Sequence, residues 1–192
     1  MKKEWVMKRV LVFTSLLTSM VLIASCAQTQ TAPVTTAQVM KDGDLTVPAD
    51  YKSWPTYLSE VQRPDVKQVR ELYINSIGAK ATVGAAFPDG TVSVMELYKA
   101  KEGADGALMK SADGKLVKGD LLKVYVMGKG KGWGETAPAG LRNGDWVYSA
   151  YLADGKTASA DPAVSCRACH LPLGESKDYI HRYDEYFQKR KS

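Results

Sequence analysis

The sequence contains few of the residues that usually bind metals or form covalent links. Its 192 residues include two histidines and three cysteines. Two of the cysteines, Cys166 and Cys169, lie beside His170 near the C-terminus. A structural zinc site here would need His181 as its fourth ligand, because the chain has no other histidine. A simple disulfide between the two cysteines would leave His170 unexplained, so the cluster needs a different interpretation.

The chain also lacks an apolar run long enough to cross a membrane. The longest such run, residues 10–24, is shorter than the roughly 20 residues that a bilayer requires. It follows a basic start and leads through small residues to Cys26, which predicts a signal peptide over residues 1–25. The residues before Cys26 resemble the bacterial lipobox, in which cleavage leaves a lipid-bearing cysteine as the new N-terminus. A plain secretory signal with an incidental Cys26 is the alternative.

A lipid on Cys26 would hold the exported protein at a bacterial membrane, on the side that faces the periplasm. Ala27 provides no inner-membrane retention signal, which favours the outer membrane. Residues 26–44, rich in Gln, Thr and Ala, predict a lipidated flexible tether, and the folded domain is expected over residues 45–192. Removal of residues 1–25 takes three net charges from the total of +5, so no nucleic-acid partner is expected.

The rest of the chain predicts a sheet-dominated α+β fold. Apolar and polar residues alternate, as in half-buried strands, over residues 70–75, 91–98, 121–127 and 145–152. Asp-Gly and Asn-Gly pairs mark tight turns between several of these segments. The sheet is therefore expected to be antiparallel. In its second strand, Met95 should face the opposite side from Val94.

Helices are expected in two places. Residues 77–86 predict a short one. A second is predicted after a Ser176 or Asp178 cap, where apolar residues recur at helical spacing. These residues are Tyr179, Ile180, Tyr183, Tyr186 and Phe187. The glycine- and lysine-rich residues 128–132 lack the spacing of a phosphate loop and predict a flexible hairpin connection.

Residues 166–170, Cys-Arg-Ala-Cys-His, have the C-x-x-C-H order of haem c attachment. Two cysteines three apart can reach both vinyl groups at one edge of a porphyrin, and the next histidine projects over the ring to bind iron. The predicted export agrees, since haem is attached to apocytochromes outside the cytoplasm. The motif predicts one covalent haem c, with Cys166 and Cys169 as thioether anchors and His170 as the iron ligand.

The position of the motif argues against other proteins that share it. A thioredoxin-like redox pair would lie near the front of its domain, whereas Cys166 lies near the end. Small electron carriers use a downstream methionine, but no Met follows Cys169. Cytochromes c′ carry a late motif in a four-helix bundle, which the strand pattern contradicts. His181 faces away from the apolar stripe of its predicted helix and is expected to be exposed and not a sixth ligand.

The order of several segments around the motif resembles the cytochrome P-460 and cytochrome c′-beta family, over residues 51–183. The segments are residues 69–75, 87–92 and 145–148 before C-x-x-C-H, and Asp178 after it. The resemblance implies a sheet that covers one face of the haem and an open distal site on the iron. It also implies a homodimer in many members.

The two branches of this family differ at one position. Cytochromes P-460 oxidise hydroxylamine at a haem cross-linked to a lysine, and that lysine precedes a glutamate and a leucine. Here Met95 stands at this position, before Glu96 and Leu97. A thioether has no amine for the link, so Met95 favours the c′-beta branch, which binds nitric oxide and other small gases at a five-coordinate haem. Met95 is interpreted either as packing on the porphyrin or as an iron ligand.

Arg70 matches a position that places a guanidinium in the distal pocket of the P-460 branch. There it would donate to an iron-bound ligand or pair with a haem propionate. The alternative is a surface arginine on a strand.

These residues predict a periplasm-facing c-type haem protein that binds nitric oxide or a related small ligand at an open iron site. Electron transfer with a partner cytochrome is a further expected role. Two alternatives stay open. One is an enzyme of the cytochrome P-460 type that oxidises hydroxylamine or nitric oxide. The other is a six-coordinate electron carrier in which His170 and Met95 both bind iron.

Overall fold

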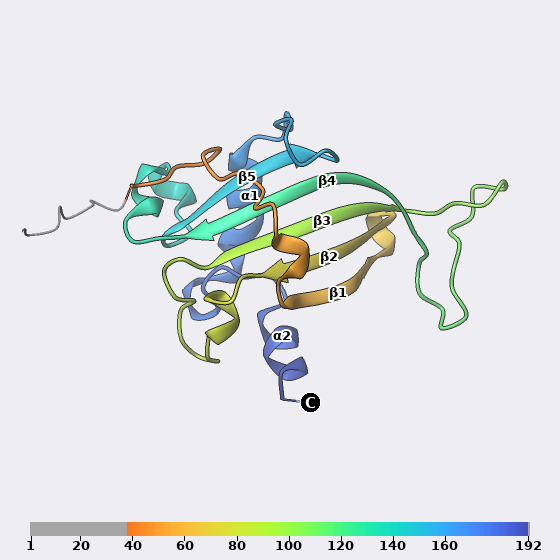
Figure 1. Ribbon diagram of the computed structural model, residues 1–192, viewed down its shortest axis with the longest axis horizontal. Coiled ribbons are helices and arrows are strands. Elements are labelled where there is room, and N and C mark those ends of the chain that lie inside the picture. The colour runs from red at the N-terminus through yellow and green to blue at the C-terminus, as the bar shows by residue number, and fades with distance from the viewer. Residues whose placement is uncertain (1–37, 192) are drawn as a thin grey trace, which may run out of the picture. The chain divides into compact units, whose positions relative to one another are not determined.

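The computed structural model describes residues 38–191 (Figure 1). The predicted signal peptide, the predicted lipidation site Cys26 and the first part of the predicted tether lie outside the described residues. Within residues 38–191, no helix is both long enough and apolar enough to span a bilayer.

Five strands form one antiparallel sheet in which each strand pairs with the next along the chain. The strands are β1 (Thr56–Arg63), β2 (Gln68–Ile74), β3 (Val92–Ala100), β4 (Lys118–Lys129) and β5 (Trp146–Leu152). The predicted antiparallel α+β fold is confirmed, and four of these strands were expected. β1 was missed because a bulge between Leu58 and Val61, with Glu60 at φ 51°, interrupts its alternation.

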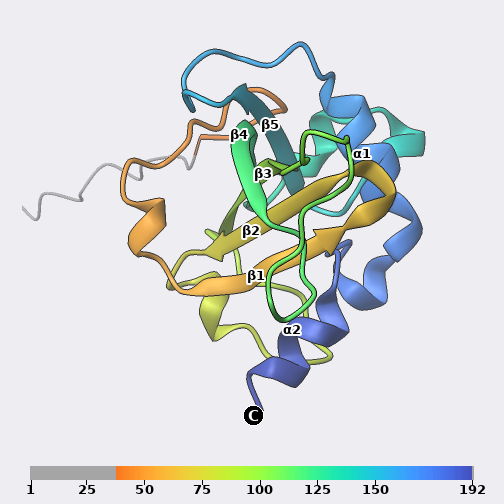
Figure 2. The same ribbon diagram turned by 90° about the vertical axis from the view of Figure 1, so that its right-hand side faces the viewer.

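The two faces of the sheet are covered by different parts of the chain, as Figure 2 shows. On one face Val94 and Val126 pack against Leu45 and Tyr51 from the segment before β1. The other face carries Trp146, which packs with aromatic residues of the C-terminal segment. Met95 lies on this second face, opposite Val94, as the alternation predicted.

The second face is covered by two short helices, α1 (Ala163–His170) and α2 (Tyr183–Lys189) (Figure 2). The predicted helix over residues 77–86 is wrong. Only one 3-10 turn, Gly78–Lys80, forms there, and Gly84 adopts φ 83°, which a right-handed helix cannot accommodate.

The predicted C-terminal helix begins later than expected. Asp178, Tyr179 and Arg182 all have positive φ, between 47° and 57°, so the helix cannot start before Tyr183. The predicted apolar stripe is nevertheless buried from Ile180 to Phe187. The stripe was therefore assigned correctly, but its first part is a sharp turn instead of a helix.

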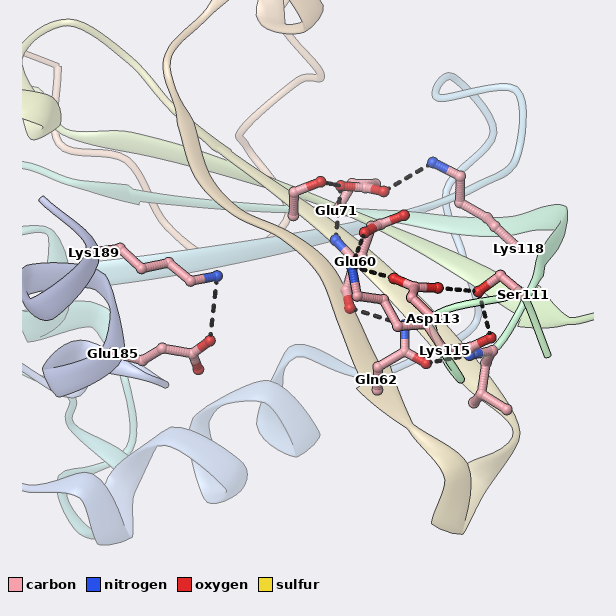
Figure 3. Close-up of polar contacts among 11 residues, drawn as sticks. Glu60, Gln62, Glu71, Ser111, Asp113, Lys115, Lys118, Glu185 and Lys189 are labelled. Carbon is pink, nitrogen blue, oxygen red and sulfur yellow. Dashed lines mark hydrogen bonds and ion pairs between the residues drawn. The ribbon is translucent and has the colours of Figure 1, made fainter. Parts of the chain in front are cut away.

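The connection between β3 and β4, residues 101–117, extends away from the sheet as a long arm (Figure 1). Its returning half is tied to β1, because Lys115 Nζ lies 2.8 Å from a Glu60 carboxylate oxygen and the Leu116 amide donates to Gln62 (Figure 3). At the start of β4, Lys118 pairs with Glu71 of β2 at 2.8 Å.

The sheet faces can be tested with two substitutions on β4. Val126 is 2% exposed, whereas Leu122, earlier in the same strand, is 41% exposed. Val126→Ala is expected to lower the free energy of unfolding by about 2 kcal/mol, because it leaves a cavity in the core. Leu122→Ala should change it by less than about 0.5 kcal/mol. Chemical denaturation measures both, and equal effects would contradict the packing described.

Candidate functional site

The cysteines and the histidine of the C-x-x-C-H motif all lie on one side of α1. Cys169 and His170 follow Cys166 by three and four residues, and residues with these spacings share a face of a helix. Cys166 is partly buried, Cys169 is exposed, and both are free thiols. Burial raises the pKa of the Cys166 thiol, and Asp42 and Asp161 raise it further. Within residues 38–191, no three His, Cys, Asp or Glu side chains cluster closely enough to hold a metal ion.

The imidazole of His170 is oriented by the backbone of the segment that follows α1. Its Nδ1 lies 2.7 Å from the carbonyl oxygen of Tyr179, an acceptor, so Nδ1 carries the proton in this bond. Burial lowers the pKa of His170 to about 4, which keeps the ring neutral at pH 7. The unprotonated Nε2 is therefore the free nitrogen. This is the usual arrangement of metal-binding histidines, whose second nitrogen donates to a carbonyl or carboxylate.

A different side of α1 is held by Arg167, which is 1% exposed. Its guanidinium makes two hydrogen bonds to the carboxylate of Asp42, at 2.6 and 2.9 Å, and a third to the Trp146 carbonyl. Asn143 donates its side-chain amide to the Arg167 carbonyl. Asp42 lies within the predicted tether, yet it is hydrogen-bonded to the domain through Arg167. These contacts fix the orientation of α1 relative to β5.

A cavity of about 470 Å³ lies between α1 and the second face of the sheet. This volume is within the usual range for small-molecule and cofactor sites. Cys166, Cys169 and His170 line one wall, and residues of β2, β3 and β4 line the other. The structure thus brings together every site residue that the sequence predicted within residues 38–191.

Met95 occupies the centre of the sheet wall. It pairs in register with Leu72 of β2 and Tyr125 of β4, and all three line the cavity. Leu97 and Met127 extend this wall along their strands. The central part of the wall is consequently largely apolar, with a thioether at its middle.

Arg70 lines the same wall, and its Nε is buried without a hydrogen-bond partner among the described residues. Its terminal nitrogen Nη2 donates to Gln68 at 3.0 Å. Burial lowers the pKa of Arg70, and the neighbouring Arg63 lowers it further. A partly buried guanidinium with an unused donor is suited to an anionic or polar group within the cavity.

A second polar group of the wall combines Tyr125, Lys123 and Asp161. The Tyr125 hydroxyl and the Lys123 ammonium both donate to one oxygen of Asp161, at 2.8 and 2.6 Å. The bond from Lys123 lowers the pKa of Asp161 most, followed by the bond from Tyr125, so the carboxylate is ionised at pH 7. No pattern in the sequence indicated this cluster, because Asp161 comes from a loop far from β4.

His181 is exposed, as the sequence predicted. It nevertheless borders the cavity, and its ring lies edge-on to that of His170 with centroids 4.6 Å apart. Its Nε2 is 3.4 Å from the Cys169 sulfur. The helical periodicity that placed His181 away from the site does not apply, because Arg182 at φ 55° interrupts the helix there.

Comparison with known proteins agrees with this architecture. The family description Cytochrome P460 matches residues 48–182, which is more than two thirds of the chain. The match includes the whole sheet and the C-x-x-C-H motif. No curated protein matches the chain significantly. The family match, over a fold with this sheet and this site, establishes that the chain belongs to the cytochrome P460 family.

Proposed function

We propose that this protein carries one haem c, attached through Cys166 and Cys169 with His170 Nε2 bound to the iron, and that it binds nitric oxide or a related small ligand at the opposite face of the iron. Family membership implies the haem cofactor. The observation that carries the rest is the orientation of His170. Its Nδ1 is engaged by the Tyr179 carbonyl, which leaves Nε2 for the cavity that also contains both cysteines.

The residues around the cavity fit a haem. Five buried side-chain polar atoms have no hydrogen-bond partner within the described residues, and four of them belong to residues that line this cavity. They belong to Arg70, Trp146, Tyr148 and Ser149. A large apolar ring with two carboxylates would pack against the apolar wall and offer acceptors to such donors.

The sheet wall supports a small ligand at the distal side. When bound, haem supplies an iron centre that can coordinate a diatomic or nitrogen-oxide ligand. Met95, Leu72 and Leu97 provide apolar surface that limits water at that side, and Arg70 provides a donor for the bound ligand or for a propionate. Met95 has no amine and cannot provide the lysine-type cross-link of the cytochromes P-460.

An enzymatic function is the second candidate, and the Tyr125–Asp161–Lys123 cluster favours it. Oxidation of hydroxylamine or nitric oxide releases protons, which need acceptors near the substrate. Asp161 is an ionised carboxylate in the cavity wall, and Tyr125, which donates to it, pairs in register with Met95. Turnover of hydroxylamine with reduction of an added acceptor would support this candidate over simple ligand binding.

We further propose that the protein is exported and held by a lipid on Cys26 at a membrane that faces the periplasm. It would bind its small ligand there and exchange electrons with a partner cytochrome. The supporting feature is the basic, apolar and small-residue order that precedes Cys26. Haem attachment outside the cytoplasm agrees with this location.

The histidine assignment predicts different outcomes for the two histidines. His170→Ala, produced with the haem-attachment machinery present, is expected to lose axial nitrogen ligation of the iron. His181→Ala is the matched control and should keep it, because His181 is the neighbouring exposed ring. Absorption and electron paramagnetic resonance spectra measure the ligation. An unchanged His170→Ala spectrum would show that another residue binds the iron.

The open distal site predicts how the reduced protein responds to carbon monoxide. The wild-type protein should bind it readily, and Met95→Ala should bind it equally, since Met95 packs near the iron without coordinating it. Met127→Ala, on the adjacent strand, serves as the control. If Met95 binds the iron instead, the wild-type protein would resist carbon monoxide and only Met95→Ala would gain binding.

A further inference from the structure

An ion pair is buried beside the haem-binding segment, between Lys129 at the end of β4 and Asp178. The Lys129 ammonium lies 2.8 and 2.7 Å from the two carboxylate oxygens of Asp178. The side chains are only 10% and 7% exposed. One carboxylate oxygen also accepts the Phe87 amide at 2.8 Å, so Asp178 is held by two separate parts of the chain.

Asp178 begins a backbone turn that is costly to form. Asp178 and Tyr179 have φ of 47° and 57°, so two consecutive residues other than glycine adopt the left-handed conformation. A residue other than glycine persists in this conformation only where its surroundings enforce it. The Tyr179 amide donates to the Gly174 carbonyl at 3.0 Å. The Asp178 and Ile180 amides make two more local bonds, to the Glu175 and Lys177 carbonyls. The Asp178 side chain connects the turn to the sheet.

This turn directs the Tyr179 carbonyl at His170. The acceptor that fixes the imidazole therefore belongs to the residue directly after the buried carboxylate. The linkage runs from the end of β4, through the ion pair and one strained peptide unit, to Nδ1 of the histidine. A shift of Asp178 away from Lys129 would move this carbonyl relative to the ring.

We infer that Lys129 and Asp178 are positioning residues that set how strongly His170 donates to the iron. The inference rests on the proposed role of His170 as the axial ligand. A short bond from Nδ1 to an acceptor makes a ligating imidazole more basic, and hydrogen bonding of this kind tunes the potential of haem iron. When the Tyr179 carbonyl is held close to Nδ1, the more basic imidazole favours the oxidised iron and lowers its reduction potential. When the carbonyl is displaced, the reduced iron is favoured and the potential rises.

A purely stabilising role does not account for this pair equally well. Replacing a buried ion pair by neutral side chains of similar volume is often neutral or stabilising, because two charges need not be desolvated. The pair fixes the position of the turn relative to the end of β4. Specifying one arrangement of the chain is a better attested role for buried charges than adding stability.

The test uses the holoprotein with the double substitution Lys129→Met and Asp178→Asn. This change keeps side-chain volume and net charge, leaves no unpaired buried charge, and retains an acceptor for the Phe87 amide. Asparagine also tolerates the left-handed conformation, so only the link to β4 is removed. The expected results are a higher midpoint reduction potential and a lower iron–histidine stretching frequency in the resonance Raman spectrum of the reduced protein.

The matched control is Lys118→Met with Glu71→Gln, which removes another ion pair that has a buried carboxylate (Figure 3). Glu71 lies between Arg70 and Leu72, which line the cavity, so alternation places its side chain on the opposite face of the sheet. It should leave both quantities unchanged. If the first double variant does not fold, Lys129→Arg keeps the charge but moves the donors, and it should shift both quantities by less in the same direction.

The outcomes separate this inference from the proposed function. An iron–histidine band in the wild-type protein, absent in His170→Ala, supports the axial ligand. If that band exists but the Lys129 and Asp178 variants leave its frequency and the potential unchanged, the positioning role is overturned. A shift of equal size in the Lys118 and Glu71 control would also overturn it, because any lost ion pair would then have the same effect. Absence of the band in a wild-type protein that binds carbon monoxide readily, and so has an open site on the iron, would instead refute the proposed ligand.

Discussion

The hydrogen bond from His170 Nδ1 to the Tyr179 carbonyl is the contact on which the site depends. At 2.7 Å it selects one tautomer, and it leaves Nε2 as the free nitrogen at the cavity. The bond exists because the chain turns sharply after α1, through residues with positive φ, instead of continuing as a helix. Lys129 and Arg167 hold the two sides of this arrangement, one through Asp178 and the other through Asp42.

The residues of the site come from two walls of the cavity, one formed by α1 and the other by the sheet. The helical wall provides the cysteines and the histidine at one helical face, where local spacing brings them together. The sheet wall provides Met95 and Arg70 at neighbouring strands, where register brings them together. Under the proposed function, this antiparallel sheet would hold these side chains at a fixed distance from a small ligand on the iron.

Much of this could be predicted from the sequence, because it depends on local order. Strand alternation placed Met95 opposite Val94, and C-x-x-C-H singled out Cys166, Cys169 and His170, although the sequence predicted no helix there. The missing parts depend on contacts between distant segments. The sequence predicts a flexible connection at Lys129, since nothing near it indicates its partner Asp178. The bulge at Glu60 interrupts the alternation that would have indicated β1. The predicted helix does not extend through Asp178 and Tyr179, because tertiary contacts enforce a left-handed conformation that these residues do not prefer.

The central claim is that one haem is covalently held at the motif of α1, and the mass of the denatured protein tests it most directly. The protein would be produced with the haem-attachment system, denatured and treated with a thiol-alkylating reagent. The account predicts a mass greater than that of the processed polypeptide by one haem, with Cys166 and Cys169 both unreactive. A polypeptide that lacks the haem mass and has both thiols alkylated would contradict it.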